Sequence, residues 1–179
     1  TESTRTAGIT RTGISCRIPR SVTALPQLMS LARNALDEAS EVPLSRWDVD
    51  AVETRGMNAD VKARIRYGCF LASVQHFDNA FFRIKRTEAA VLDPQQRLML
   101  EVGYSSLHNA GKRRSSLLAS DAGVFLGIAA AEFAQLLAAS PAGGSVYAAT
   151  GSSHSIACGR LSYVLGLHGP CVAHDTACS

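Results

Sequence analysis

The chain has 179 residues, which is enough for one domain with a hydrophobic core or for part of a larger one. Its net charge of +3 is spread along the sequence rather than gathered in a patch, which argues against nucleic acid as a partner. The five cysteines are scattered and include no CxxC pair, so we expect thiols in an intracellular reducing compartment, either the cytoplasm or a plastid.

The first half of the chain carries few signals of regular structure. Residues 7–16 (AGITRTGISC) are expected to form a strand, and residues 25–36 (LPQLMSLARNAL) place apolar side chains at helical spacing. From about residue 40 to 80 there is no periodicity, although Trp47 and the aromatic residues of HFDNAFF lie there. Such a stretch is typical of a packed functional loop, and it would equally serve as cover for the core.

The strongest helix signal covers residues 94–110. Asp93 is the expected N-cap, Pro94 suits the first helical position, Gln96 would close a capping box, and Gly111 follows the end. Apolar residues occupy two adjoining sides of this segment, so we expect a helix that is buried on more than one side.

Two short apolar runs predict neighbouring central strands. Residues 123–129 (GVFLGIA) are apolar on both faces, as in a strand that helices cover, and residues 170–174 (PCVAH) lead to Cys178. The first run continues into AAEFAQLLAAS, a helix expected to end near Pro141; because this region contains Glu132, it does not predict a membrane span. Alternating strands and helices indicate a layered α/β protein.

A further helix is expected between these strands, over residues 153–165. Ser152 or Ser153 would cap its start, and Gly166 or Gly169 would end it. The side chains expected to face inward are Ile156, Ala157, Leu161, Val164 and Leu165.

Cys178, in the segment DTACS, comes just after a strand and at the expected start of a helix. The unpaired N–H groups and the dipole of a helix start favour a thiolate and can receive an oxyanion, so this position suits a nucleophile. A buried structural thiol fits the local pattern equally well, because free cysteine is among the most buried residue types.

A metal site is a further alternative for this region. The side chains concerned are His154, Cys158, His168, Cys171, His174 and Cys178. Cys171 and His174 are an odd number of residues apart, so in a strand they point to opposite faces, whereas zinc needs ligands that converge on it. We therefore expect no metal ion, and no cofactor bound by the chain itself.

Several stretches taken together resemble a known family. In the family's order they are GISCRIP, VPLSRWDVDA, HFDNAFF, LDPQQRLMLEVGYSSLHNAG, GVFLGIA, ATGSSHSIACGRLSYVLGLHGPC and DTACS. From about residue 8 to its last residue the chain resembles the N-terminal part of a ketosynthase (beta-ketoacyl synthase) domain of the type I polyketide synthase or multidomain fatty-acid synthase kind. The resemblance implies one partial domain over residues 1–179, the N-terminal half of a thiolase-like layered α/β/α/β/α fold.

The same resemblance implies a reaction and partners. Cys178 would be the nucleophile that accepts an acyl chain from the phosphopantetheine thioester of an acyl carrier protein, before decarboxylative Claisen condensation with a malonyl unit. The implied partners are that carrier protein and a second copy in a homodimer, or a larger assembly. On this basis we favour a catalytic thiol over a structural one.

The chain departs from the family's motifs at several positions. Arg20 stands where glycine usually follows the CRFP motif, and Arg83, Lys85 and Arg86 replace Gly, Ser and Pro of FFGISPREA. These cations would alter a surface turn or a carrier-protein contact, or would form only a solvated charge cluster. His174 stands before DTACS in place of an apolar or small residue, and we do not assign it as the base of the thiol.

The family's second half carries two further histidines and a glycine-rich oxyanion segment, which this sequence lacks. Each lost preorganised donor commonly costs on the order of 10² to 10³ in rate, so we expect condensation by this chain alone to be negligible. Two hypotheses stay open, the front portion of an active ketosynthase and a truncated, non-catalytic scaffold protein. The intact DTACS favours the enzyme.

Overall fold

The computed structural model describes residues 12–19, 22–52 and 55–176, so the predictions at Arg20 and Cys178 lie outside the described residues. The chain divides into two compact units: a small unit, Cys16–Ser73, and a main unit, Thr1–Ser15 with Val74–Ser179. Within the described ranges, no helix is both long and hydrophobic enough to cross a bilayer.

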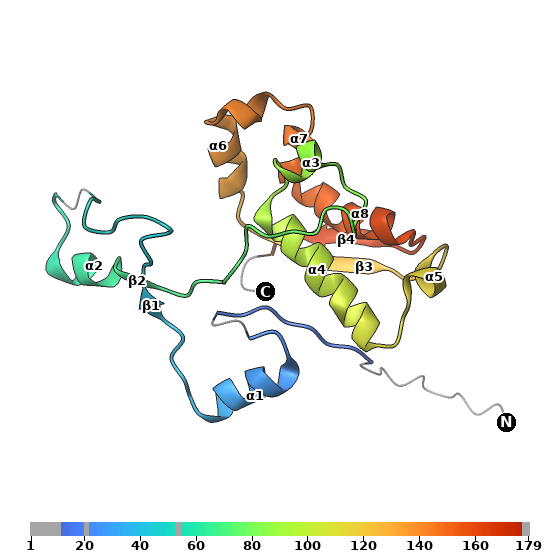
Figure 1. Cartoon of the computed structure of the whole chain (residues 1–179), viewed down its shortest axis with the longest axis horizontal. Coiled ribbons are helices and arrows are strands. Elements are labelled where there is room, and N and C mark those ends of the chain that lie inside the picture. Colours follow the sequence, from blue (N-terminus) through green and yellow to red (C-terminus); the bar gives the residue numbers. More distant parts are fainter. Residues whose placement is uncertain (1–11, 20–21, 53–54, 177–179) are drawn as a thin grey trace. The chain divides into compact units, whose positions relative to one another are not determined.

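The small unit has short elements joined by irregular backbone, as the lack of periodicity predicts (Figure 1). They are α1 (Leu25–Arg33), β1 (Ser40–Glu41), α2 (Ala59–Arg64) and β2 (Tyr67–Gly68), with β1 and β2 antiparallel. The Gln27 side chain accepts hydrogen bonds from the backbone N–H groups of Thr23 and Ala24, which fixes the start of α1. The predicted first helix is thus confirmed, whereas the strand expected over residues 7–16 is wrong in its described part.

The main unit contains the other elements (Figure 1). They are α3 (Arg86–Ala89), α4 (Pro94–Asn109), α5 (Arg114–Leu117), β3 (Val124–Gly127), α6 (Glu132–Ala138), the 3₁₀ helix η1 (Pro141–Gly144), α7 (Ala148–Ser152), α8 (His154–Leu165) and β4 (Cys171–His174). Apolar side chains from α4, α5, β3 and α8 and from neighbouring loops share one core, centred on the fully buried Leu92, Leu100 and Leu165.

Strands β3 and β4 are parallel neighbours, as predicted, with Val124 opposite Cys171 and Gly127 opposite His174. The expectation that both faces of these strands are covered is wrong for this chain, because Phe125 is 69% exposed. Successive side chains in a strand point to opposite faces. Val124 therefore joins the core that α4 and α8 contribute to, and Phe125 points to the other face, which the described residues leave open.

Helix α4 begins and ends where its sequence signals predict. The Asp93 carboxylate accepts the N–H of Gln95 at 2.7 Å, Pro94 is the first helical residue, and Gly111 follows the end with φ of +74°. The expected capping box is wrong, because the Gln96 side chain points away from the cap and toward α8.

Helix α8 is also confirmed, and Gly166 ends it in the left-handed conformation with φ of +67°. Ser153 occupies the N-cap position, but its hydroxyl pairs with the Ser155 hydroxyl at 2.9 Å instead of capping the backbone. Ile156 is exposed, contrary to expectation, because it lies on the side of α8 away from the core. Helix α6 ends before Pro141, as predicted.

Candidate functional site

Strand β4 carries the chain toward the predicted nucleophile. Its pairing with β3 holds to its last residue, because the Ile128 N–H donates to the His174 carbonyl at 3.0 Å. Cys178 and its expected helix lie outside the described residues, so its role stays a prediction. The described part of the site is the strand that precedes this thiol and the surface around that strand.

A hollow of about 270 Å³ lies between α8 and the end of β4. Its polar side chains are His154, Ser155, Cys158, Cys171, His174 and Asp175. His154 Nε2 lies 3.0 Å from the Ala130 carbonyl oxygen, which fits a ring that carries its proton on Nε2. His174 is exposed at the end of β4. Two imidazoles, two thiols and a carboxylate therefore border one small space.

The two thiols of this hollow differ in exposure. Cys158 is only 3% exposed and its Sγ lies 3.5 Å from the Ser155 carbonyl oxygen, whereas Cys171 is exposed. Burial, and after it the adjacent Cys171 thiol, raises the pKa of Cys158 above that of an ordinary thiol. Cys158 therefore stays protonated at neutral pH and is a poor nucleophile, as expected of a buried structural thiol.

The metal alternative gains no support from the described ranges. Within residues 12–19, 22–52 and 55–176, no three His, Cys, Asp or Glu side chains come close enough together to hold a metal ion. Cys16, Cys69, Cys158 and Cys171 are all free thiols.

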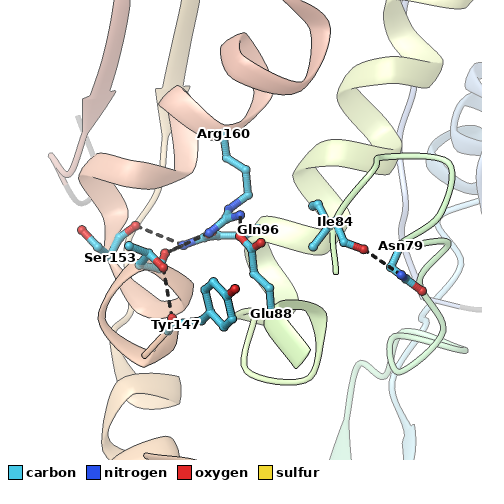
Figure 2. Close-up of polar contacts among 8 residues, drawn as sticks. Asn79, Ile84, Glu88, Gln96, Tyr147, Ser153 and Arg160 are labelled. Carbon is cyan, nitrogen blue, oxygen red and sulfur yellow. Dashed lines mark hydrogen bonds and ion pairs between the residues drawn. The ribbon is translucent and has the colours of Figure 1, made fainter. Parts of the chain in front are cut away.

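A second polar group lies inside the main unit around Arg160 (Figure 2). Arg160 donates from Nε to Gln96 Oε1 at 2.7 Å, from Nη2 to the Thr150 carbonyl at 3.2 Å, and forms an ion pair with Glu88 through Nη1. Gln96 in turn donates from Nε2 to the Ser153 carbonyl at 3.1 Å. We call these five residues the Arg160 cluster; it joins α3 and α4 to α7, to α8 and to the turn between α7 and α8.

The Arg160 cluster fixes the position of that turn. The Arg160 side chain is 8% exposed, and a buried charge is tolerated only when it is paired and hydrogen-bonded. Close backbone packing adds to the effect: the Asp93 N–H donates to the Gly151 carbonyl at 2.8 Å, and a Cβ on Gly151 would lie 2.3 Å from the Val91 carbonyl oxygen. The segment before α8 is therefore held against the start of α4.

Sequence reasoning missed the Arg160 cluster. The available signal was Arg160 itself, the one arginine or lysine of a helix that has no acidic residue; such a cation, if buried, would need an acceptor from elsewhere in the chain. Gln96 was assigned to the helix cap because glutamine at the third helical position is typical of a capping box.

The cations that replace the family's FFGISPREA residues lie on the surface. Arg83 and Lys85 are exposed and border a hollow of about 730 Å³, together with Arg114 and Tyr163. Arg114 is held in place, because its guanidinium donates to the carbonyls of Phe81 and Val164, both at 2.9 Å. The exposure of Arg83 and Lys85 fits a solvated charge cluster; a carrier-protein contact stays a prediction.

Comparison with known sequences shows which proteins the chain is similar to. The chain matches the family model for the N-terminal domain of beta-ketoacyl synthases over residues 7–179. It is 40% identical over 167 residues to one of the phenolphthiocerol/phthiocerol polyketide synthases of Mycobacterium tuberculosis, covering 93% of this chain and 11% of that protein. It is 41% identical over 179 residues to a phenolphthiocerol synthesis polyketide synthase type I of Mycobacterium bovis, covering 99% of this chain and 8% of the relative. These relatives are bacterial, which gives the expected plastid location no support.

Solved structures of ketosynthases are similar to the chain. The ketosynthase from module 6 of the bacillaene synthase of Bacillus subtilis aligns with a TM-score of 0.72 and 31% identity, covering 94% of this chain and 26% of that one. The oxazolomycin ketosynthase domain of Streptomyces albus gives 0.75 and 34%, covering 92% and 29%. The predicted α/β fold of the thiolase-like ketosynthases is confirmed, and the chain spans less than a third of either structure.

Proposed function

Because the chain belongs to the beta-ketoacyl synthase family, matching its N-terminal domain over residues 7–179, we propose that it is the front portion of a polyketide synthase ketosynthase in which Cys178 is the acyl-accepting nucleophile. The observation that carries this proposal is the position of DTACS directly after β4, the strand that pairs with the apolar β3. The resemblance implies that Cys178 opens a helix, and a helix start favours the thiolate form of a cysteine.

The first proposed step is acyl transfer. The Cys178 thiolate attacks the carbonyl carbon of an acyl thioester and forms a new C–S bond, and the C–S bond to the donor thiol then breaks. Backbone N–H groups at the start of the helix would stabilise the oxyanion that forms between these events. We propose that the donor is the phosphopantetheine arm of an acyl carrier protein, which makes that protein a partner of the chain.

Condensation requires a second step. A malonyl unit loses carbon dioxide, the enolate carbon attacks the acyl carbonyl on Cys178, and the C–S bond breaks to free the thiolate. Donors aimed at the enolate are needed for this step, and the family supplies them from two histidines in its second half. We therefore propose that this chain alone accepts acyl groups but does not condense them.

A non-catalytic scaffold protein is the second candidate, and the exposed apolar residues of the main unit favour an association role. Tyr163 is 88% exposed and Phe125 is 69% exposed, and exposed apolar surface of this kind is typical of contact with another protein. A second copy of the chain, or a larger assembly, would cover them. Association is compatible with both candidates, so only chemistry at Cys178 separates them.

The test is acyl loading from a short acyl N-acetylcysteamine thioester, which reproduces the reactive end of phosphopantetheine. Intact-mass measurement should find one acyl group on the native chain and on a Cys69→Ser control, which removes an exposed thiol of the small unit. The Cys178→Ser variant should carry none. No loading of the native chain, or equal loading of Cys178→Ser, would contradict the catalytic proposal and favour the scaffold.

A further inference from the structure

The hollow beside β4 holds a pair of thiols for which the proposed function has no use. Cys158 comes from α8 and Cys171 from the first position of β4, and both border the same space. Helix α8 packs directly on β4, which brings the two side chains together although twelve residues separate them. The Cys171 thiol lies close enough to Cys158 to contribute, after burial, to the raised pKa of the Cys158 thiol.

We propose that Cys158 and Cys171 form an oxidisable thiol pair, which two-electron oxidants of the peroxide class convert into a disulfide between α8 and β4. The pair is distinct from Cys178, so this inference does not depend on the proposed acyl transfer.

The difference in exposure sets the order of events. Cys171 is exposed and reaches hydrogen peroxide first, whereas Cys158 is buried and protonated. The Cys171 thiolate attacks one peroxide oxygen, the O–O bond breaks, and a sulfenic acid forms; the hydroxide that leaves takes up the proton that the Cys171 thiol had released and becomes water. The Cys158 sulfur then attacks the sulfenic sulfur, the S–S bond forms, and the S–O bond breaks. The hydroxide that leaves takes up the Cys158 proton as water.

The overall step is balanced: two thiols and one hydrogen peroxide give one disulfide and two waters, and the two sulfurs together lose two electrons. A nearby resolving thiol is what diverts a sulfenic acid to a disulfide instead of to higher oxidation states. Cys158 is placed for that role, because it is shielded from bulk peroxide and adjacent to Cys171. A reductant such as dithiothreitol reverses the reaction by thiol–disulfide exchange.

The disulfide would restrict the movement of the strand that precedes Cys178. Strand β4 ends at His174, and DTACS follows directly. Oxidation would tie this strand to α8, which the Arg160 cluster already holds against α4. The disulfide would thus be a reversible covalent link between α8 and the strand that leads to the proposed nucleophile.

Peptide mapping in a Cys178→Ser background tests the pair without ambiguity. The chain is treated with a small excess of hydrogen peroxide, alkylated under denaturing conditions, and digested with trypsin. Cleavage after Arg160 places Cys158 and Cys171 on separate peptides, so their disulfide appears as a linked peptide that dithiothreitol removes. We expect its yield to exceed that of any other cysteine pair by about tenfold, because proximity raises the effective concentration of the second thiol.

Two variants give matched controls. Cys171→Ser removes an exposed thiol of the pair and should abolish the linked peptide, whereas Cys69→Ser removes an exposed thiol of the small unit and should leave its yield unchanged. A linked peptide at the level of random pairs, or one that involves Cys69 in equal yield, would overturn the proposal.

A second probe avoids oxidation altogether. Phenylarsine oxide bridges two adjacent thiols through its arsenic atom and releases one water, and it binds single thiols weakly. We expect one arsenical per chain in the Cys178→Ser and Cys69→Ser/Cys178→Ser proteins and none in Cys171→Ser/Cys178→Ser. Equal arsenical binding by all three proteins would show that the thiols of α8 and β4 do not act as a pair.

Discussion

Arg160 Nε donates to Gln96 Oε1 at 2.7 Å and so links α8 to α4 across 64 positions of the sequence (Figure 2). Both side chains are buried, and each satisfies polar atoms that would otherwise lack partners. The link holds the turn before α8 in place, and α8 in turn packs on the strand that leads to Cys178. Stability of the main unit and placement of the proposed nucleophile are thus connected through one buried contact.

Breaking this contact should destabilise the main unit. Arg160→Met leaves the Glu88 carboxylate and the Gln96 carbonyl without their buried donor, which should cost about 3 kcal/mol, and Gln96→Leu should cost about 1 to 2 kcal/mol. Arg86→Met, on an exposed arginine of α3, is the control and should change stability by less than about 0.5 kcal/mol. Urea unfolding should be followed by far-ultraviolet circular dichroism, because Trp47 lies in the small unit and its fluorescence reports on that unit. Equal costs for Arg160→Met and Arg86→Met would contradict this account.

The close approach at Gly151 predicts a pair of glycine variants with opposite effects. Gly151→Ala would place its Cβ 2.3 Å from the Val91 carbonyl oxygen, so it should lower stability by about 2 kcal/mol. Gly159→Ala meets no atom within 4 Å and lies inside α8, so it should raise stability by about 0.5 to 1 kcal/mol. The same unfolding measurement compares them. If the Gly151→Ala protein is as stable as the native chain, α7 and the segment before α4 can move apart at little cost in free energy.

Arg83 provides a test of backbone strain. Its φ is +57°, a conformation that disfavours residues with a Cβ, and the FFGISPREA motif that the segment resembles has glycine there. Arg83→Gly should therefore raise the free energy of unfolding by about 0.5 to 1 kcal/mol. Lys85→Gly removes the same charge from an exposed position with φ of −64° and should be neutral or destabilising. If both variants lose stability alike, the Arg83 side chain makes contacts that outweigh its strain.

Local signals in the sequence were sufficient for the longer helices α4 and α8, whereas the short helices α2, α3, α5 and α7 were not predicted. Asp93, Pro94 and Gly111 define α4 because capping depends on residues within one turn of the helix end, and the same holds for Gly166 at the end of α8. The pairing of β3 with β4 followed from two apolar runs separated by helices.

The features that could not be predicted depend on distant partners. Gln96 has the position of a capping residue, but a buried arginine 64 residues away offers it a better partner than the helix cap does. Phe125 and Ile156 were assigned to the interior because they are apolar, yet the packing around each strand or helix decides which faces are covered. For Cys178 the sequence identified the residue through DTACS and its resemblance, and the described residues end just before it.

The raised pKa of Cys158 predicts a pH dependence that separates it from an activated thiol. Iodoacetamide reacts with thiolates, so a thiol whose pKa is raised reacts slowly at neutral pH and gains rate only under alkaline conditions. We expect Cys158 to be alkylated more slowly than the other cysteines at neutral pH. Its rate of alkylation should increase as the pH rises toward and above the pKa of an ordinary thiol. Labelling of Cys158 at neutral pH as fast as that of exposed Cys69 would show that burial does not protect it.

Competition among the five cysteines for a limiting amount of iodoacetamide tests the central claim most directly, because it does not require the acyl substrate to be known. The chain is labelled briefly near neutral pH, quenched, digested and mapped, with Cys178→Ser as the control. If Cys178 is a nucleophile activated at a helix start, it should be labelled first, ahead of exposed Cys69 and Cys171 and well ahead of buried Cys158. Labelling of Cys178 no faster than that of Cys69 and Cys171 would contradict the claim that this chain carries the activated thiol of a ketosynthase.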